Sequence, residues 1–214
     1  MNSILKSVMN ADQLLKRYAT GEREFSQANL HTASLGEVCL ADINLTRSDL
    51  AKALLSQTIL RRANLSEANL TAATLWRTDL RGAKLTWATL NRSSLIRARA
   101  SKAKLLQASL IKTDLRLADL RYADLTGANL TGADLRYANL FGANLTGAIL
   151  NRADLTGANL CKANLTRACL DRAILTRTTL LSANLTGVDL THVDLRRATL
   201  TDATLPIAPL TLQR

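Results

Sequence analysis

Histidine and cysteine, the residue types most often found in metal sites and nucleophilic catalysis, number only two and three in this 214-residue sequence. Histidine together with cysteine could ligate zinc, or could supply a nucleophile and its base. Carboxylates at regular spacing could bind a cation. The candidates are His31, His192, Cys39, Cys161, Cys169, Asp114, Asp134 and Asp154. Whether any of them can act together depends on the elements that carry them.

The dominant sequence feature is a period of five residues. From Leu30 to Leu210, 36 of the 37 positions at this interval are Leu, and Ala100 is the exception. Two positions earlier, 27 of 37 residues are Ala, and one position earlier 19 of 37 are Asn or Asp. Five residues of α-helix turn by about 500°, which would scatter the leucines around the helix. An odd period in a strand would alternate faces. The pattern therefore predicts short extended segments joined by corners, with Leu and Ala inside a coil.

A weaker self-similarity at twenty residues predicts how many segments make one coil. In every fourth segment the residue after Leu is usually Thr or Ser, as at Thr46, Ser66 and Thr86. Four segments per coil give a tube with four sides, in which residues twenty apart lie one above the other. Successive coils are then about 4.8 Å apart, the usual spacing of paired strands.

The segments ADLTGANLTGADL (123–135) and ANLFGANLTGAIL (138–150) resemble the pentapeptide repeat family. The resemblance implies an all-β solenoid, a right-handed quadrilateral β-helix with four repeats per coil. The lead-in from Leu14 to Phe25 is similar to the start of cyanobacterial members. The resemblance also permits a role like that of cyanobacterial relatives that influence cell differentiation.

Three regions are expected along the chain: an N-terminal helical cap (1–24), a solenoid of about nine coils (25–210) and a short tail (211–214). Apolar residues and a stop signal at Gly21 predict a helix over about 2–20, which would cover the first coil. Pro206 and Pro209 would blunt the other end, because proline lacks a backbone donor. No helix follows the last coil, so we expect a monomer or a weak end-to-end dimer.

In this geometry the candidate chemical groups lie far apart. His31 and His192 share a side of the tube but are eight coils, about 38 Å, apart. The cysteines are also too widely separated for a disulfide. The three aspartates flank Arg116 and Arg136, so we expect local ion pairs rather than a cation site. The sequence therefore predicts no enzyme activity, no cofactor and no metal.

Charge and hydropathy narrow the classes of partner. Lys and Arg number 28 against 17 Asp and Glu, a net charge of +11, which favours an acidic partner. No apolar run is long enough to span a membrane. The N-terminal sequence lacks the apolar stretch of a signal peptide, so a cytoplasmic protein is expected.

The region 76–112 departs most from the repeat pattern. It contains both tryptophans, the single broken leucine position and nine basic residues against one acid, Asp79. We define a predicted binding stripe of vertical neighbours: Trp76, Arg77, Ile96, Arg97, Arg116, Leu117, Arg136 and Tyr137. The remaining basic residues form a basic belt: Arg81, Lys84, Arg92, Arg99, Lys102, Lys104 and Lys112. Trp, Tyr and Arg dominate binding hot spots, and stacked like charges are costly to a fold, so these residues are candidates for partner binding.

Four functions remain open from sequence. The favoured one is a non-catalytic scaffold whose flat lateral wall binds a protein with an acidic surface. The alternative is binding of nucleic acid or another polyanion through the basic belt, although no recognition helix or aromatic stacking series supports it. Gyrase protection by DNA mimicry, suggested by the family resemblance, ranks last because mimicry requires an acidic surface. A structural spacer without a specific ligand is the fourth.

Overall fold

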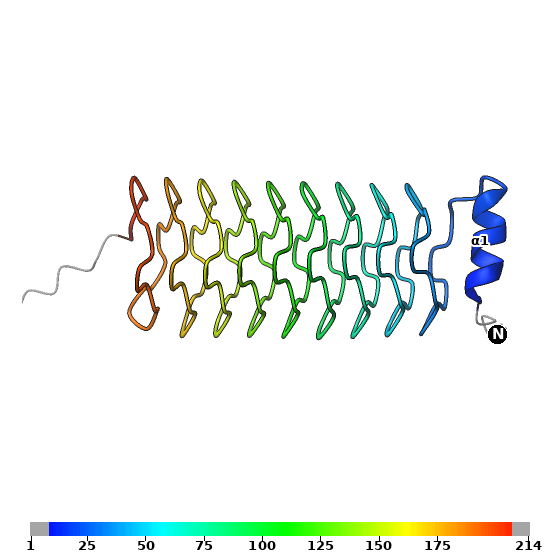
Figure 1. Cartoon of the computed structure of the whole chain (residues 1–214), viewed down its shortest axis with the longest axis horizontal. Helices are drawn as coiled ribbons and strands as arrows, with labels where there is room; N and C mark the ends of the chain where they lie inside the picture. The colour runs from blue at the N-terminus through cyan, green and yellow to red at the C-terminus, as the bar shows by residue number, and fades with distance from the viewer. Residues whose placement is uncertain (1–8, 207–214) are drawn as a thin grey trace, which may run out of the picture.

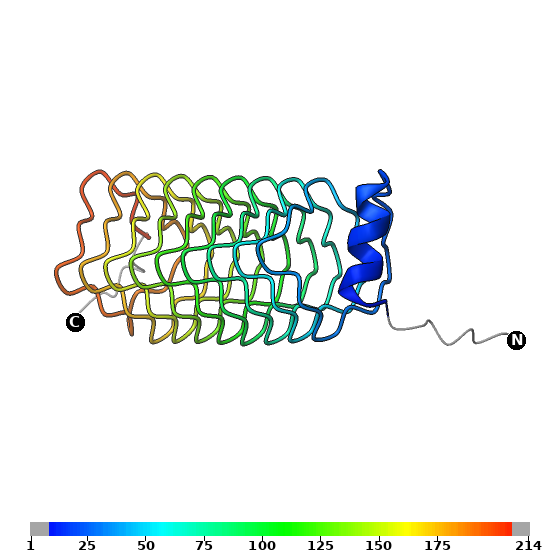
Figure 2. The same ribbon diagram turned by 45° about the vertical axis from the view of Figure 1, so that its right-hand side comes forward.

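The computed structural model describes residues 9–206, and in these residues one short helix is followed by a stack of similar coils. The helix, α1, spans Ala11–Ala19 and lies across the N-terminal end of the stack (Figure 1). Turning the view shows the coils following one another along a straight rod (Figure 2). Within the described range, no helix has the length and apolar character to cross a bilayer.

Parallel bridges between single residues join successive coils, in place of longer strands. Every bridge in the described residues pairs positions twenty apart, from Glu24–Asn44 to Asn184–Thr204. Each bridge is accompanied by two backbone hydrogen bonds: for the Asp79–Arg99 bridge, Leu80 N donates to Arg99 O at 2.7 Å and Arg99 N donates to Thr78 O at 2.9 Å. This register confirms the predicted twenty-residue coil and the vertical neighbours that follow from it.

The bridges define four walls, and two-residue turns define the corners between them. We name each wall by its bridging residues: the first carries Lys84 and Lys104, the second Cys169, the third Asp114 and Asp134, and the fourth Asp79 and Arg99. Residues 76–77, 96–97, 116–117 and 136–137 form the corner between the third and fourth walls. The predicted stripe is therefore a corner rather than a flat wall.

The core is built from stacked leucines and the small residues before them. The leucines at the five-residue positions from Leu30 to Leu185 are almost fully buried, as are nearly all alanines two positions before them. Ala100 is buried at the one leucine position that lacks Leu. Where Thr replaces Ala, its hydroxyl donates to a backbone carbonyl of the preceding coil, as from Thr78 to Leu55 O at 2.6 Å. These substitutions place polar atoms in the core without leaving them unpaired.

The Asn and Asp residues before Leu stabilise the corners. In all 19 cases the side-chain Oδ1 accepts a hydrogen bond from the backbone N–H two residues further on. Between Asp79 and Asp114 no residue at this position is Asn or Asp. The basic belt thus lies where the chain has given up this local stabilisation.

The corners require a left-handed residue, but not glycine. The second corner residue has φ between 54° and 72° in 28 non-glycine residues as well as in seven glycines. Positive φ alone therefore does not explain why Gly127, Gly142 or Gly157 is glycine.

The N-terminal helix is shorter than the expected span of about 2–20. Asn10 is its N-cap, since Asn10 Oδ1 accepts from Gln13 N at 2.8 Å and Gln13 Oε1 accepts from Asn10 N at 3.2 Å. This capping box fixes the helix start at Ala11. Leu14 is fully buried against the first coil, and Tyr18 Oη donates to Ala41 O at 2.8 Å. Residues 1–8 and 207–214, with Pro209 and the predicted tail, lie outside the described residues.

Candidate functional site: a corner groove and an arginine recess

Seven of the eight residues of the predicted stripe line one groove. The groove has a volume of about 410 Å³ and follows the corner between the third and fourth walls over four successive coils. Its most exposed apolar members are Leu117 and Tyr137, at 47% and 57% exposure. We call this the corner groove, and its lining residues are Trp76, Ile96, Arg97, Arg116, Leu117, Arg136 and Tyr137.

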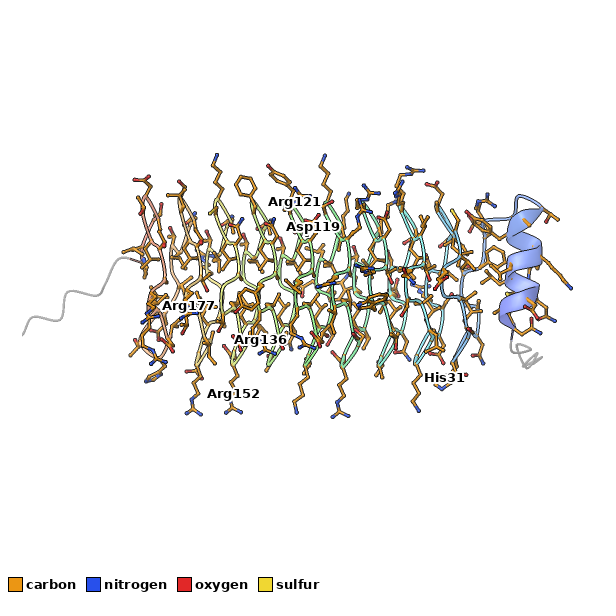
Figure 3. The ribbon with its side chains drawn as sticks, viewed as in Figure 1. His31, Asp119, Arg121, Arg136, Arg152 and Arg177 are labelled. Carbon is orange, nitrogen blue, oxygen red and sulfur yellow. The ribbon has the colours of Figure 1, made fainter. Side chains whose placement is uncertain are left out.

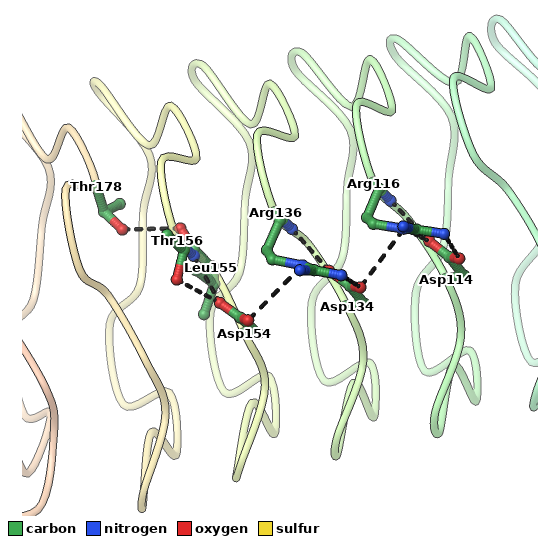
Figure 4. Close-up of polar contacts among 8 residues, drawn as sticks. All are labelled: Asp114, Arg116, Asp134, Arg136, Asp154, Leu155, Thr156 and Thr178. Atoms are coloured by element: carbon green, nitrogen blue, oxygen red, sulfur yellow. Dashed lines mark hydrogen bonds and ion pairs between the residues drawn. The ribbon is translucent and has the colours of Figure 1, made fainter.

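Two arginines at one edge of the corner groove are neutralised by aspartates of the third wall. Arg116 pairs with Asp114 at 2.7 Å and approaches Asp134 at 3.5 Å. Arg136 pairs with Asp134 at 2.6 Å and approaches Asp154 at 3.8 Å, which completes a ladder of alternating charges (Figure 4). These ion pairs confirm the predicted role of the three aspartates. Arg116 and Arg136 therefore contribute fixed guanidinium planes to the groove rather than free charge.

The ladder also perturbs its titratable groups. Burial alone would raise the pKa of Asp134, but hydrogen bonds from the Arg136 side chain and backbone outweigh burial and lower that pKa. The hydrogen bond to Asp134 correspondingly raises the pKa of Arg136. Both groups remain charged at neutral pH, so the shape of this edge does not change over the physiological range.

Arg77, the eighth residue of the stripe, does not line the corner groove. Its guanidinium lies over the ring of the adjacent Trp76, with its central carbon 4.8 Å from the ring centroid. Such a cation–π contact contributes about 0.5–1 kcal/mol at an exposed position. Arg77 instead faces a second hollow of about 380 Å³ on the fourth wall. We call this hollow the arginine recess, and its lining residues are Gln57, Ile59, Arg61, Arg77, Asp79, Arg97 and Arg99. Arg97 lines both hollows and connects them.

Asp79 is the one acid of the arginine recess, and its side chain is 7% exposed. It pairs with Arg61 and with Arg81, each at 2.7 Å. Burial opposes ionisation of Asp79, but the hydrogen bonds from Arg81 and Arg61 outweigh it and lower the pKa to about 2. Asp79 is therefore a permanent anion that fixes two of the surrounding guanidinium groups.

The basic belt is spread over several walls and corners. Arg81 is half-buried in its pair with Asp79. Lys84 and Lys104 are bridge partners on the first wall, so their like charges are neighbours, as predicted. No belt residue other than Arg81 forms an ion pair with any described acid. The belt therefore has unbalanced charge but does not form a single binding track.

The described histidines and cysteines do not come together as a zinc site or as a nucleophile with its base. His31 and His192 each lie 3.4 Å from a different aspartate, Asp49 and Asp171. His31 and Arg152 project outward from the rod, far from one another along its length (Figure 3). Among the described residues no three His, Cys, Asp or Glu side chains are grouped as metal ligands.

One local irregularity lies near the C-terminal end of the second wall. The expected bridge between Cys169 and Asp189 is not formed, although both residues are described. The wall opens there into a cavity of about 310 Å³ that includes Cys169, Asp171 and His192. Only the Asp171–His192 contact, at 3.4 Å, links these three side chains.

Sequence reasoning missed Arg61, Gln57 and Ile59 as parts of a site. Their signal was present, because Ile59 lies twenty residues before Asp79 and forty before Arg99 on the same wall. The predicted stripe contains the vertical neighbours of the corner but not those of the adjoining fourth wall.

The i to i+20 ladder, the leucine core and the four-sided coil define a β-helical repeat protein. The sequence model "Pentapeptide repeats" matches in eight copies, over residues 39–136 and 138–206. The chain belongs to the pentapeptide repeat family, whose members form right-handed quadrilateral β-helices.

Among solved structures, the chain is similar to HetL from the cyanobacterium Nostoc sp. strain PCC 7120, described as involved in the regulation of heterocyst differentiation. The two are 34% identical with a TM-score of 0.69, over 94% of this chain and 99% of HetL. A pentapeptide repeat protein of the Arabidopsis thaliana thylakoid lumen is 35% identical over 55% of this chain and 71% of its own, with a TM-score of 0.36. QnrB1, a plasmid-mediated fluoroquinolone resistance protein, is 15% identical over 85% and 89%, with a TM-score of 0.47. No curated protein matches the chain.

Proposed function

We propose that this chain is a non-catalytic scaffold that binds a protein partner through the corner groove, in the cytoplasm and as a monomer or weak end-to-end dimer. One observation carries the proposal: aromatic, aliphatic and guanidinium groups from four successive coils line a single hollow of about 410 Å³. The bridged coils hold the backbone of all of them, so little backbone entropy is lost on binding. The similarity to HetL supports a regulatory role.

The chemistry of the groove indicates the chemistry of its partner. Leu117 and Tyr137 offer exposed apolar surface, whereas Arg97 has no acidic partner among the described residues. A segment that presents an apolar side chain beside an acidic one would complement both features. We therefore propose that the partner contributes a short acidic and apolar segment to the groove.

Selection from a random peptide library on the immobilised full chain tests this proposal. We expect enrichment of peptides that combine acidic and large apolar residues, and at least tenfold weaker binding of those peptides to the double variant Leu117→Ala with Tyr137→Ala. Tyr122→Ala is the matched control, because Tyr122 is an equally exposed tyrosine on another corner. Equal loss in the control variant, or no enrichment, would refute the groove as the binding site.

The polyanion alternative is distinguished by salt. Binding to a polyanion neutralises phosphates and releases counterions. For each tenfold increase in salt concentration, the logarithm of the binding constant therefore falls by about 0.7–0.9 per phosphate contact. Groove binding through apolar contacts should change little in comparison. DNA mimicry is disfavoured by the net charge of +11, since a mimic must present negative charge.

A further inference from the structure

The arginine recess contains more positive charge than its own acid can balance. Four of its lining residues are arginines and one is an aspartate, so the lining has a formal charge of 4 − 1 = +3. Two like charges on neighbouring strands destabilise a sheet. An uncompensated group of this kind on a rigid wall requires either solvent or a bound anion.

The carboxylate of Asp79 has no remaining capacity for the other arginines. Its Oδ1 accepts from Arg81 Nε at 2.8 Å and from Arg81 N at 3.3 Å. Its Oδ2 accepts from Arg81 Nη2 and Arg61 Nε, both at 2.7 Å. Asp79 thus anchors Arg61 and Arg81 but cannot neutralise Arg77, Arg97 or Arg99.

Arg99 lies between two acids on the fourth wall and pairs with neither. Its bridge partners are Asp79 in the preceding coil and Asp119 in the following coil. Asp119 is held by Arg121, whose Nε and Nη2 donate to it at 2.8 Å each. Every acid that the wall brings beside Arg99 is therefore committed to another arginine.

Arg77 and Arg97 occupy the same corner position on successive coils, and neither has an ion-pair partner among the described residues. Trp76 holds the Arg77 guanidinium in place from one side. Three arginines without an ion-pair partner among the described residues, Arg77, Arg97 and Arg99, thus line one recess of about 380 Å³.

We propose that the arginine recess is a binding site for a dianionic phosphoryl group, held by Arg77, Arg97 and Arg99. A phosphoryl group has about −2 charge and three acceptor oxygens, and guanidinium groups bind such oxygens in pairs. A carboxylate has only one charge and would leave most of the +3 lining charge uncompensated. The site lies beside the corner groove and shares Arg97 with it, but its ligand does not depend on groove binding.

Titration of the ¹⁵N-labelled full chain with inorganic phosphate, observed at the arginine side-chain Nε resonances, tests this site. We expect saturable shifts at pH 7.5 and binding at least threefold weaker at pH 5.5, where phosphate is mainly a monoanion. The double variant Arg97→Gln with Arg99→Gln should bind at least tenfold more weakly. The matched control, Arg92→Gln with Lys112→Gln, removes the same charge from another corner and should retain wild-type binding.

A phosphoserine peptide and its unphosphorylated form distinguish the source of the phosphoryl group. Tighter binding of the phosphopeptide than of free phosphate assigns the site to a phosphorylated protein, and equal binding assigns it to a free phosphate. Shifts that do not saturate, or equal weakening in the control variant, would overturn the site. The phosphate titration contains no groove ligand, so a negative result would not affect the proposal that the corner groove binds a partner. A failed peptide selection would likewise not affect the proposed phosphoryl site.

Discussion

The ring of Tyr137 occupies the space where Gly157, one coil further on, would have a side chain. A Cβ at Gly157 would lie 2.6 Å from Tyr137 Cε1, which is closer than real Cβ contacts allow. Since many non-glycine residues take the same corner φ, the room for the ring explains this glycine better than its backbone conformation does. The end of the corner groove is thus shaped by a residue that does not line it.

We expect Gly157→Ala to displace Tyr137 and weaken binding of groove-selected peptides by at least threefold. Gly147→Ala is the matched control, because Gly147 has nearly the same φ and no atom within 4 Å of the added Cβ. Each substitution should cost about 1 kcal/mol of stability, from the left-handed backbone. Calorimetry on the peptides and thermal unfolding of both variants would measure the two effects. Equal peptide binding by both variants would contradict the proposed role of Gly157.

Asp79→Asn should destabilise the fold in a pH-dependent way. The pKa of Asp79 is about 2 in the folded protein, against an ordinary value of 3.8. Its stabilisation is therefore complete above about pH 4 and is lost as the pH falls through about 2. The difference in pKa corresponds to about 2 kcal/mol. Urea denaturation should show that difference between wild type and variant at pH 7, and almost none near pH 2.

Glu67→Gln provides the comparison for the Asp79 measurement. Glu67 pairs with Arg47 at 2.8 Å, but its side chain is 44% exposed. An exposed pair contributes little to stability, so this variant should unfold close to wild type at every pH. A similar loss in both variants would mean that burial of Asp79 is not the cause.

Ala100→Leu should stabilise the solenoid. Ala100 interrupts the leucine stack between Leu80 and Leu120, and all three residues are buried. Burying a leucine side chain contributes up to about 1.5–3 kcal/mol when space is available. Ala98→Leu, two residues away, should instead destabilise the fold, because an alanine on the wall permits close packing there. Differential scanning calorimetry would separate the two, and a lower melting temperature for Ala100→Leu would show that neighbouring groups have filled the space.

Leu14→Ala should weaken the N-terminal cap. Leu14 is fully buried between α1 and the first coil, and truncation of a buried leucine costs about 2–5 kcal/mol. Release of the helix would expose the backbone edge of the first coil, so we also expect concentration-dependent association. Light scattering and hydrogen exchange at Phe25 to Leu30 would detect this. Unchanged exchange in that segment would indicate that α1 is not required to protect the edge.

The sequence predicted most of the fold because one repeated requirement acts at every fifth residue. Leu must enter a narrow core and Asn or Asp must accept the corner N–H, so the period and the twenty-residue register were both readable. The vertical alignment of the stripe residues followed from the same register, as with Trp76 below Ile96, but their position at a corner did not. The start of α1 was less accessible, since the Asn10 cap competes with apolar residues further upstream.

The arginine recess was harder to predict because each aspartate has several arginines within reach, and the sequence does not show which of them it pairs with. Asp79 could have paired with Arg99, its bridge partner, but instead accepts hydrogen bonds from Arg61 and Arg81. Nothing in the residue types decides between these partners. The reach and direction of each side chain decide it, and so determine which guanidinium groups stay unpaired.

The strict pairing of residues twenty apart has a consequence for how such chains can change length. Insertion or loss of twenty residues would lengthen or shorten the rod by one whole coil, and every outward side chain would stay on its own wall or corner. Insertion or loss of five would rotate everything beyond the change by a quarter turn. Between Arg97 and Arg116, such a quarter turn would place the two halves of the corner groove on different corners. Changes in length therefore preserve the outer surface only when they add or remove whole coils.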